Sequence, residues 1–394
     1  MDEALTALRV LSSSEAEQWV RAALTGSPTG GGDAVLVELD EVHHRPQHDT
    51  SAGFHVTITT PDGREVVEYL VATTAQVSGE VSTITHDDLT LRFWQHPADP
   101  RLPSLPQACT PASVADWLDQ PADSVELQLL AYRPLRRAVL RAGTQRGALY
   151  VKVVLPRKGA DQARRHRLLG AAGLSPEVVA EPAPGVLVID SAAGEPLAQV
   201  LSRWTHGGDW FDPQRIVDLL DAMPAEVMDL PTREAWTARL DVHARGAEAT
   251  LPAATAEIAA LEAGITAFVD SRLAGPWVPV HGDLYEANLF VDDDRLTMID
   301  VDSAGPGHRV DDLACVLAHA AVLPALSPQH YAGLERWVEQ AARVFEVGHD
   351  AAALRARVAG VLLTLVAGAP EDQATSRLAL AKQWYRHALA ATDQ

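Results

Sequence analysis

The sequence has little of what marks a secreted, disulfide-bonded or membrane protein. Its 394 residues include 2 cysteines, Cys109 and Cys315, whose separation suggests neither a disulfide framework nor a metal site. No run approaches the ~18 apolar residues of a membrane span. The N-terminal stretch MDEALTALRV carries acids where a signal peptide places Lys or Arg. We therefore expect a cytoplasmic protein that does not cross a membrane.

Positive charge is also scarce. Lys and Arg total 32 against 53 Asp and Glu, which gives a formal net charge of −21. Such a chain repels a phosphate backbone, and no stretch combines clustered basic residues with interleaved aromatics, so a nucleic-acid partner is not expected. The negative field is compatible with a cationic small molecule, although solubility alone is a sufficient reason for it.

The first hundred residues are expected to form a separate α+β unit. Ser14 and Glu17 are spaced as a capping box at the start of a helix that ends at Leu24 and is followed by the stretch TGGGD. The turn sequence Pro61-Asp62-Gly63 joins the second and third of the expected strands. The histidine-rich segment 43–48 matches no metal-site spacing and is predicted to be a solvated loop. The expected strands are Val35–Val42, Phe54–Thr60, Glu65–Thr73 and Leu89–Trp94.

A stretch with five prolines, Pro97–Pro111, separates this unit from the next one. Because proline lacks a backbone donor, we expect a linker or a strap here. A short helix from Thr110 to Leu118 should follow. Three sheet strands are then predicted, at Val125–Ala131, Arg137–Ala142 and Ala148–Leu155.

The remainder of the chain is mostly helical by its i, i+3, i+4 apolar spacing. A clear apolar helix, VDDLACVLAHAAVL, begins after the sequence 303–309, which we expect to be a flexible turn. Asp312 stands in the first turn of that helix, where it suits the helix dipole and can accept hydrogen bonds from loop amides. The further expected helices are Leu197–Trp204, Pro213–Met223, Arg233–Ala247, Ala254–Leu273, Arg355–Ala367 and Ser376–Ala390.

The segment HGDLYEANLFVDDDRLTMIDVD, residues 281–302, carries the chemistry. Leu289–Val291 and Leu296–Ile299 are apolar strands around an Asp-rich turn, so they predict an antiparallel hairpin. Pairing brings Asn288 and Asp300 to its open end. An amide oxygen and a carboxylate together suit Mg²⁺ with bound phosphates. Asp283, on the preceding loop, is left to orient a hydroxyl.

This order of an Asp, an Asn five residues later and an Asp after a hairpin is the catalytic arrangement of kinases. With HGD and the stretch IDVDSAGPGHRVDDLA it resembles the aminoglycoside phosphotransferase and choline kinase-like superfamily, which has a protein-kinase-like fold. The resemblance implies ATP and Mg²⁺ as cofactors and Asp283 as the catalytic base. The other candidates are Asn288, Asp300 and Asp302 for metal, His281 and Asp312 for structural support, and Tyr285 and Glu286 for substrate contact.

The nucleotide site is predicted from fewer residues. Lys152 lies in the apolar strand LYVKVVLP of a chain that nearly always uses Arg, and the resemblance makes it a phosphate contact. Val186–Asp190 is predicted as an apolar strand that runs into Ser191, similar to the adenine-binding hinge of the superfamily, and Asp190 and Ser191 are candidate nucleotide contacts. The helix after Lys152 lacks a Glu, which leaves Asp161 and Glu177 as weak candidates for its partner. Arginines of AYRPLRRAVLRAG replace the usual glycine-rich loop.

We therefore predict an α+β, bilobal protein-kinase-like fold with a β-rich N-lobe, a helical C-lobe and an extra N-terminal α+β module. The expected domains are the module at 1–108, the N-lobe at 109–190 and the C-lobe with the catalytic hairpin at 191–394. The expected activity is ATP- and Mg²⁺-dependent phosphorylation of a hydroxyl on a small molecule of aminoglycoside or amino-sugar type. The alternatives are a sugar kinase of maltokinase or glucosamine kinase type and a pseudokinase-like binding module.

Overall fold

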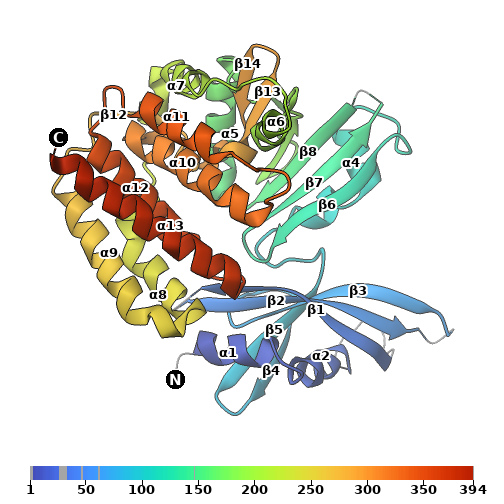
Figure 1. The fold of residues 1–394 in the computed structure, drawn as a ribbon. Helices are drawn as coiled ribbons and strands as arrows, with labels where there is room; N and C mark the ends of the chain where they lie inside the picture. Colours follow the sequence, from blue (N-terminus) through green and yellow to red (C-terminus); the bar gives the residue numbers. More distant parts are fainter. Residues whose placement is uncertain (1–2, 26–32, 46–47, 61–62, 146, 394) are drawn as a thin grey trace. The chain divides into compact units, whose positions relative to one another are not determined.

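The computed structural model describes residues 3–25, 33–45, 48–60, 63–145 and 147–393. They form two compact units, the first from Met1–Ala160 with Val178–Ser191 and the second from Asp161–Glu177 with Ala192–Gln394. The first unit holds the long strands and the second holds most of the helices (Figure 1). The predicted division into three domains stays a prediction; in the structure its first two segments share one compact unit.

The N-terminal part of the first unit is a five-stranded antiparallel sheet with two helices. The strand order is β1-β2-β3-β5-β4. Apolar side chains such as Phe54, Val56 and Phe93 are buried with those of the helices, because alternate residues of each strand face the same side. The elements are α1 (Glu3–Leu11), α2 (Ala16–Thr25), β1 (Asp33–Arg45), β2 (Asp49–Thr59), β3 (Glu65–Thr73), β4 (Ser82–His86) and β5 (Leu89–Gln95).

The helix and the four strands predicted for this part are present, whereas α1 and β4 were missed. Strand β4 is mostly exposed, so its sequence STITH gave no hydrophobic alternation to recognise. In α2 the Glu17 carboxylate accepts hydrogen bonds from Arg21, at 2.6 and 2.9 Å, instead of closing the predicted capping box. Residues 29–32 of the TGGGD stretch and residues 61–62 of the predicted turn lie outside the described residues.

The prediction of a solvated loop at 43–48 is wrong for its first three residues. They continue strand β1 and pair with the start of β2. His43 and His44 are half-buried, and His44 Nδ1 lies 2.8 Å from Thr50 Oγ1. These residues are in a strand because they pair with β2, and local composition does not encode such pairing. Pro46 and Gln47 lie outside the described residues.

A second five-stranded antiparallel sheet completes the first unit, in the order β6-β7-β8-β10-β9. The short helix predicted at Thr110–Leu118 is confirmed. The three strands predicted at Val125–Ala131, Arg137–Ala142 and Ala148–Leu155 are confirmed as well. Lys152 lies on β8 as expected and is 5% exposed. The elements are α3 (Leu105–Ala108), α4 (Pro111–Trp117), β6 (Glu126–Arg133), β7 (Arg137–Thr144), β8 (Gly147–Val154), β9 (Val178–Ala180) and β10 (Val186–Asp190). Helix α5 (Pro156–Ala171) begins in this unit, and from Asp161 it belongs to the second unit.

The proline-rich segment between the two sheets is a strap and not a free linker. Leu102, Leu105 and Ala108 are fully buried in a core that also contains Trp94 of the first sheet and Val186 of the second. Both sheets of the first unit therefore share one apolar core through this segment.

The second unit is organised around one large apolar core. Trp337 is fully buried and donates its indole N–H to Phe211 O at 2.9 Å. The start of the predicted helix Arg233–Ala247 is wrong, because the α-helix begins at Leu240, after a 3-10 turn. The α-helices are α6 (Leu197–Thr205), α7 (Gln214–Asp221), α8 (Leu240–Thr250), α9 (Thr255–Asp270), α10 (Arg309–Leu326), α11 (Glu335–Phe345), α12 (Ala351–Thr364) and α13 (Glu371–Ala390).

Short strands in this unit hold the chemistry-bearing loops. The predicted hairpin is present as β13 (Leu289–Asp292) and β14 (Arg295–Met298), with β11 (Glu195–Pro196) alongside. The predicted flexible turn at 303–309 is wrong, because its centre is strand β15 (Gly305–His308), paired with β12 (Trp277–Val280). A Gly- and Pro-rich sequence has low strand propensity, so only the partner strand fixes this conformation.

One described helical segment, Pro252–Asp270, is long and apolar enough to cross a membrane by length and composition, with a mean hydropathy of 1.2. A single segment of this kind is weak evidence for a span, because core helices of soluble proteins meet the same test. Its residues Ile258, Leu261 and Ile265 are buried in the core of the second unit. That the chain does not cross a membrane stays a prediction.

Replacing Leu102 by alanine tests the role of the strap. The side chain is fully buried in the shared core, so Leu102→Ala should lower the free energy of unfolding by about 2–5 kcal/mol. The control Leu39→Ala, at a position 44% exposed on β1, should change it by no more than about 0.5 kcal/mol. Urea unfolding followed by circular dichroism measures both. Equal stabilities of the two variants would show that the strap does not stabilise the first unit.

Candidate active site

The loop that follows β12 is held by a buried carboxylate. The amides of His281 and Gly282 donate to Asp312 Oδ2 and Oδ1, at 2.7 and 2.8 Å. Asp312 is 2% exposed in the first turn of α10. Gly282 has φ +79°, and a Cβ there would lie 2.8 Å from Ser303 O, so glycine is required. The hydrogen bonds expected between Asp312 and the loop amides are thus present.

His281 joins this loop to the hairpin. Its buried ring has Nε2 at 2.9 Å from Ile299 O, while Nδ1 lies 3.3 Å from the amide nitrogen of Asp283. A carbonyl only accepts and an amide only donates, so this network assigns the proton to Nε2. The His281 ring therefore fixes the loop against the end of β14.

Asn288 and Asp300 lie at the open end of the hairpin, as predicted. The Ile299 amide donates to Asn288 O at 2.9 Å, which places the two backbones side by side. Asn288 Nδ2 donates to Asp283 O at 3.0 Å, so its Oδ1 is the atom left for a cation. Asp300 has φ +53°, a left-handed conformation that turns the chain out of the strand. An amide oxygen and a carboxylate fit Mg²⁺.

Asp283 is half-buried, and two residues that the sequence did not single out lie beside it. Trp236 Nε1 donates to Asp283 Oδ1 at 3.2 Å. Desolvation raises the pKa of Asp283; the Arg233 guanidinium, His281 and the Trp236 hydrogen bond oppose this rise, and Asp300 adds to it. Arg233 is exposed, donates to Ser303 Oγ and lies over the Trp236 ring at 5.5 Å.

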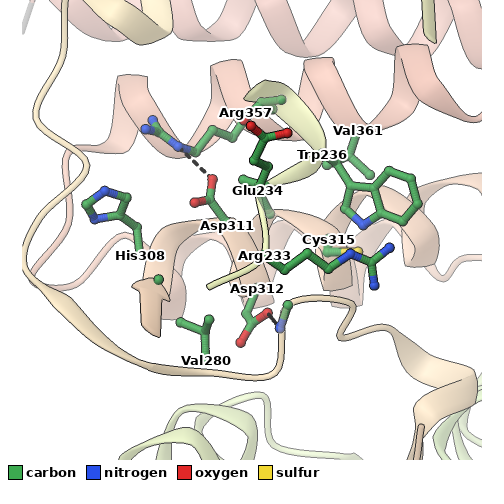
Figure 2. A pocket seen from close by; sticks show the side chains of 15 residues that line it. Arg233, Glu234, Trp236, Val280, His308, Asp311, Asp312, Cys315, Arg357 and Val361 are labelled. Carbon is green, nitrogen blue, oxygen red and sulfur yellow. Dashed lines mark hydrogen bonds and ion pairs between the residues drawn. The ribbon is translucent and has the colours of Figure 1, made fainter. Parts of the chain in front are cut away.

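A cavity of about 30 Å³ lies behind this loop. Figure 2 shows Arg233, Trp236, Asp312 and Cys315 around it, with the ion pair of Asp311 and Arg357 on one side. That volume accommodates a water molecule but neither a nucleotide nor an acceptor. The cavity is therefore part of the support of the loop and not a substrate site.

Helix α5 supports the segment after Asp300. His166 Nε2 lies 3.7 Å from Asp302 Oδ1, and Arg165 Nε donates to Ala304 O at 2.8 Å. Arg165 also forms an ion pair with Asp161, one of the two candidate partners of Lys152. Asp302 is thus engaged by the protein, and its predicted role as a metal ligand stays a prediction.

Tyr285 and Glu286, the candidate substrate contacts, differ in their surroundings. The Tyr285 ring stacks on that of His319, with centroids 4.5 Å apart and planes 25° apart. Glu286 is 6% exposed, and its Oε2 has no hydrogen-bond partner among the described residues. Burial raises the pKa of Glu286 to about 7 and lowers that of His319 to about 4.

The residues predicted to bind nucleotide belong to the first unit. Lys152 is buried on β8, between its pairing partners Val139 and Leu187. Asp190 and Ser191 are exposed at the end of β10, where the Ser191 amide donates to Asp190 Oδ1 at 2.7 Å. Their roles stay predictions. Within the described residues, no group of three or more His, Cys, Asp or Glu side chains could hold a metal ion.

The fold and the site define a class of protein. The described chain has a β-rich N-terminal part and a helical C-terminal part, which is the mixed α+β arrangement predicted for a protein-kinase-like phosphotransferase. The chain belongs to the phosphotransferase enzyme family, whose model matches residues 54–352, more than half of its length. The predicted enzyme class is thereby confirmed at the level of phosphotransferase.

Solved structures similar to this chain come from the same group. A choline/ethanolamine kinase family protein from Mesorhizobium loti shares 18% identity at a TM-score of 0.49, covering 68% of this chain and 92% of that one. A thermostable mutant of aminoglycoside phosphotransferase APH(4)-Ia, in a ternary complex with ADP and hygromycin B, shares 16% identity at a TM-score of 0.47, covering 71% and 97%. A comparison with curated proteins finds no match.

The buried carboxyl of Glu286 predicts a pH-dependent stability. Its folded-state pKa of about 7 lies above the ordinary value of 4.5, so the folded protein loses stability as pH rises through this interval. Glu286→Gln should match the wild type near pH 4.5 and exceed it by roughly 3 kcal/mol at pH 8. Urea unfolding at both pH values without divalent metal measures this.

The matched control is Glu226→Gln, at an exposed position in the same unit. It should leave the pH dependence of the free energy of unfolding unchanged. A Glu286→Gln variant whose stability parallels that of the wild type at both pH values would contradict the assignment.

Proposed function

We propose that this chain is an ATP- and Mg²⁺-dependent phosphotransferase that phosphorylates a hydroxyl group of a small molecule. The observation that carries the proposal is the position of Asp283, whose backbone carbonyl accepts the side-chain amide of Asn288 beside the metal-type oxygens at the end of the hairpin. A carboxylate so placed accepts the proton of an attacking hydroxyl, while metal ligands hold the phosphate chain. The proposed location is the cytoplasm.

The chain's own residues have distinct parts in this reaction. Trp236 orients the Asp283 carboxylate by its hydrogen bond, and His281 and Asp312 hold the loop. Asn288 and Asp300 would hold Mg²⁺, which would neutralise charge on the phosphate oxygens. Lys152 is the proposed contact of the nucleotide phosphates. Glu286, which has an unpaired buried oxygen, and Tyr285 are the proposed acceptor contacts.

Two acceptor classes are proposed, each for a different reason. The net charge of −21 favours an aminoglycoside or amino-sugar acceptor. The exposed guanidinium of Arg233 lies near Asp283 and would repel an acceptor that carries several cationic groups. It therefore favours the alternative acceptor, a neutral sugar as in maltokinases. Turnover of ATP with a panel of aminoglycosides, amino sugars, sugars and choline decides between them. The intact set of Asp283, Asn288 and Asp300 argues against a pseudokinase-like binding module.

Asp283→Asn should preserve folding and ATP binding and lower kcat by at least ~10², because a general base of this kind contributes 10²–10⁴-fold. Asp292→Asn, at the exposed end of β13, is the control and should keep full activity. Steady-state kinetics with the best acceptor of the panel measure both variants. Near-wild-type turnover by Asp283→Asn would refute the catalytic assignment.

Asp300→Ala should abolish the dependence of ATP binding on Mg²⁺, since it removes a charged metal ligand. Asp294→Ala, in the exposed turn of the same hairpin, should leave it unchanged. Calorimetric titration with ATP in the presence and absence of Mg²⁺ gives the comparison. An Asp300→Ala protein that still binds ATP more tightly with Mg²⁺ would show that the metal is held elsewhere.

A further inference from the structure

Trp236, which donates a hydrogen bond to the proposed base Asp283, follows a segment that has little support of its own. Residues 231–235 form no helix or strand, and the first four of them are exposed. Figure 2 shows Arg233, Glu234 and Trp236 along this stretch of chain. Irregular backbone with few buried side chains has low local stability unless other elements hold it. Contacts from outside the segment therefore set the position of the Trp236 indole.

The turn that follows the proposed metal ligand Asp300 lies against this segment. It is a short 3-10 turn that ends at Ala304, whose amide donates to Val301 O at 3.0 Å. At the next residue the two stretches of backbone meet, because a Cβ on Gly305 would lie only 2.8 Å from Pro231 O. The stretch that carries the metal ligand and the stretch that leads to the indole are thus in contact.

One buried guanidinium joins both stretches to helix α5. Arg165 is 5% exposed, and its Nε donates to Ala304 O at 2.8 Å while its Nη2 donates to Pro231 O at 3.2 Å. Its Nη1 donates to the carboxylate and to the carbonyl of Asp161, one turn earlier in α5. Each of the three nitrogens is thus engaged. Because a guanidinium is planar and its donors form a fixed fork, the two carbonyls are held at a set distance from each other.

We propose that Arg165 is a positioning residue, which places Trp236, and through it the Asp283 carboxylate, correctly relative to Asp300. The inference rests on the proposed function, since it takes the base and the metal ligand from there. Arg165 touches no reacting group and acts through the carbonyls of Pro231 and Ala304. Positioning of this kind matters because a misplacement of about 1 Å can cost a reaction about 10²-fold in rate.

The indole N–H of Trp236 reports its position without any phosphate transfer. Its signal in a ¹H–¹⁵N spectrum is the one that Trp236→Phe removes, and Asp283→Ala shows where it lies without the hydrogen bond. Arg165→Lys keeps the charge but loses the planar fork, so it should move the signal of Trp236 towards its position in Asp283→Ala. A folded Arg165→Lys protein in which the signal stays at its wild-type position would overturn the proposal.

The matched control is Arg355, which also joins separate elements of the second unit. Its Nε donates to Glu346 Oε1 at 2.7 Å and its Nη1 to His387 O at 3.4 Å. Arg355→Lys should leave the Trp236 signal and kcat unchanged. A shift of the same size in this variant would show that the signal reports general loosening and would overturn the specific role of Arg165.

A second variant covers the case in which Arg165→Lys does not fold. Gly305→Ala leaves Arg165 in place but adds a methyl group 2.8 Å from Pro231 O, so it separates the same two stretches. It should shift the Trp236 signal in the same direction. An unchanged signal in folded Gly305→Ala protein would show that the contact at Pro231 does not set the indole.

A double-mutant cycle tests whether Arg165 acts through Trp236. Trp236→Phe should lower kcat about tenfold, the effect of one hydrogen bond to a charged group. Arg165→Lys should lower kcat per folded molecule by a similar factor. The double variant should also be only about tenfold slower than the wild type, because both changes remove the same orientation. Effects that multiply to about a hundredfold would show that the two residues act independently and would overturn the proposal.

The two kinds of measurement separate this inference from the proposed function. The spectra need neither ATP nor an acceptor. A wild type that transfers no phosphate while Arg165→Lys shifts the Trp236 signal contradicts the proposed function and supports the bridge. An active wild type whose Arg165→Lys variant is less stable, but has an unshifted signal and full kcat per folded molecule, contradicts this inference alone.

Discussion

The geometry of the candidate active site depends on the hydrogen bonds from two loop amides to the Asp312 carboxylate. This carboxylate is buried, which raises its pKa, and the amides of His281 and Gly282 with the nearby imidazole offset part of that cost. Without it, the buried amide of His281 and the partly buried amide of Gly282 would lose their partner, at up to about 1–3 kcal/mol each. The loop that presents Asp283 has few other backbone hydrogen bonds. Its conformation therefore depends on Asp312, in the first turn of α10.

Further hydrogen bonds connect this loop to the other residues of the site. His281 fixes the end of β14, the Ile299 amide fixes Asn288, and Asn288 in turn binds the backbone of Asp283. The proposed base and the proposed metal ligands are therefore held by one connected network and not by independent loops. Such a network would keep the proposed reacting groups in place before a substrate binds, and positioning of this kind is a main source of catalysis in phosphotransferases.

The same physical device recurs in the first unit. Asp99 is a buried carboxylate that accepts hydrogen bonds from backbone amides of the strap and of the turn between β6 and β7, as Asp312 does for the loop that carries Asp283. In both places a carboxylate accepts hydrogen bonds from amides of irregular backbone. In a regular sheet a neighbouring strand would accept them, and buried amides require an acceptor. Nothing in the local composition around Asp99 distinguishes it from an ordinary turn residue.

Much of the fold and part of the site follow from the sequence alone. Apolar periodicity located most helices and strands, and the spacing of Asp283, Asn288 and Asp300 implied their convergence, since hairpin pairing is a local property. The structure was needed for strand β15, whose Gly- and Pro-rich sequence favours a turn until β12 pairs with it. It was also needed for Trp236 and Arg233, far from Asp283 in sequence. Such residues meet only through the packing of the core, which no local pattern encodes.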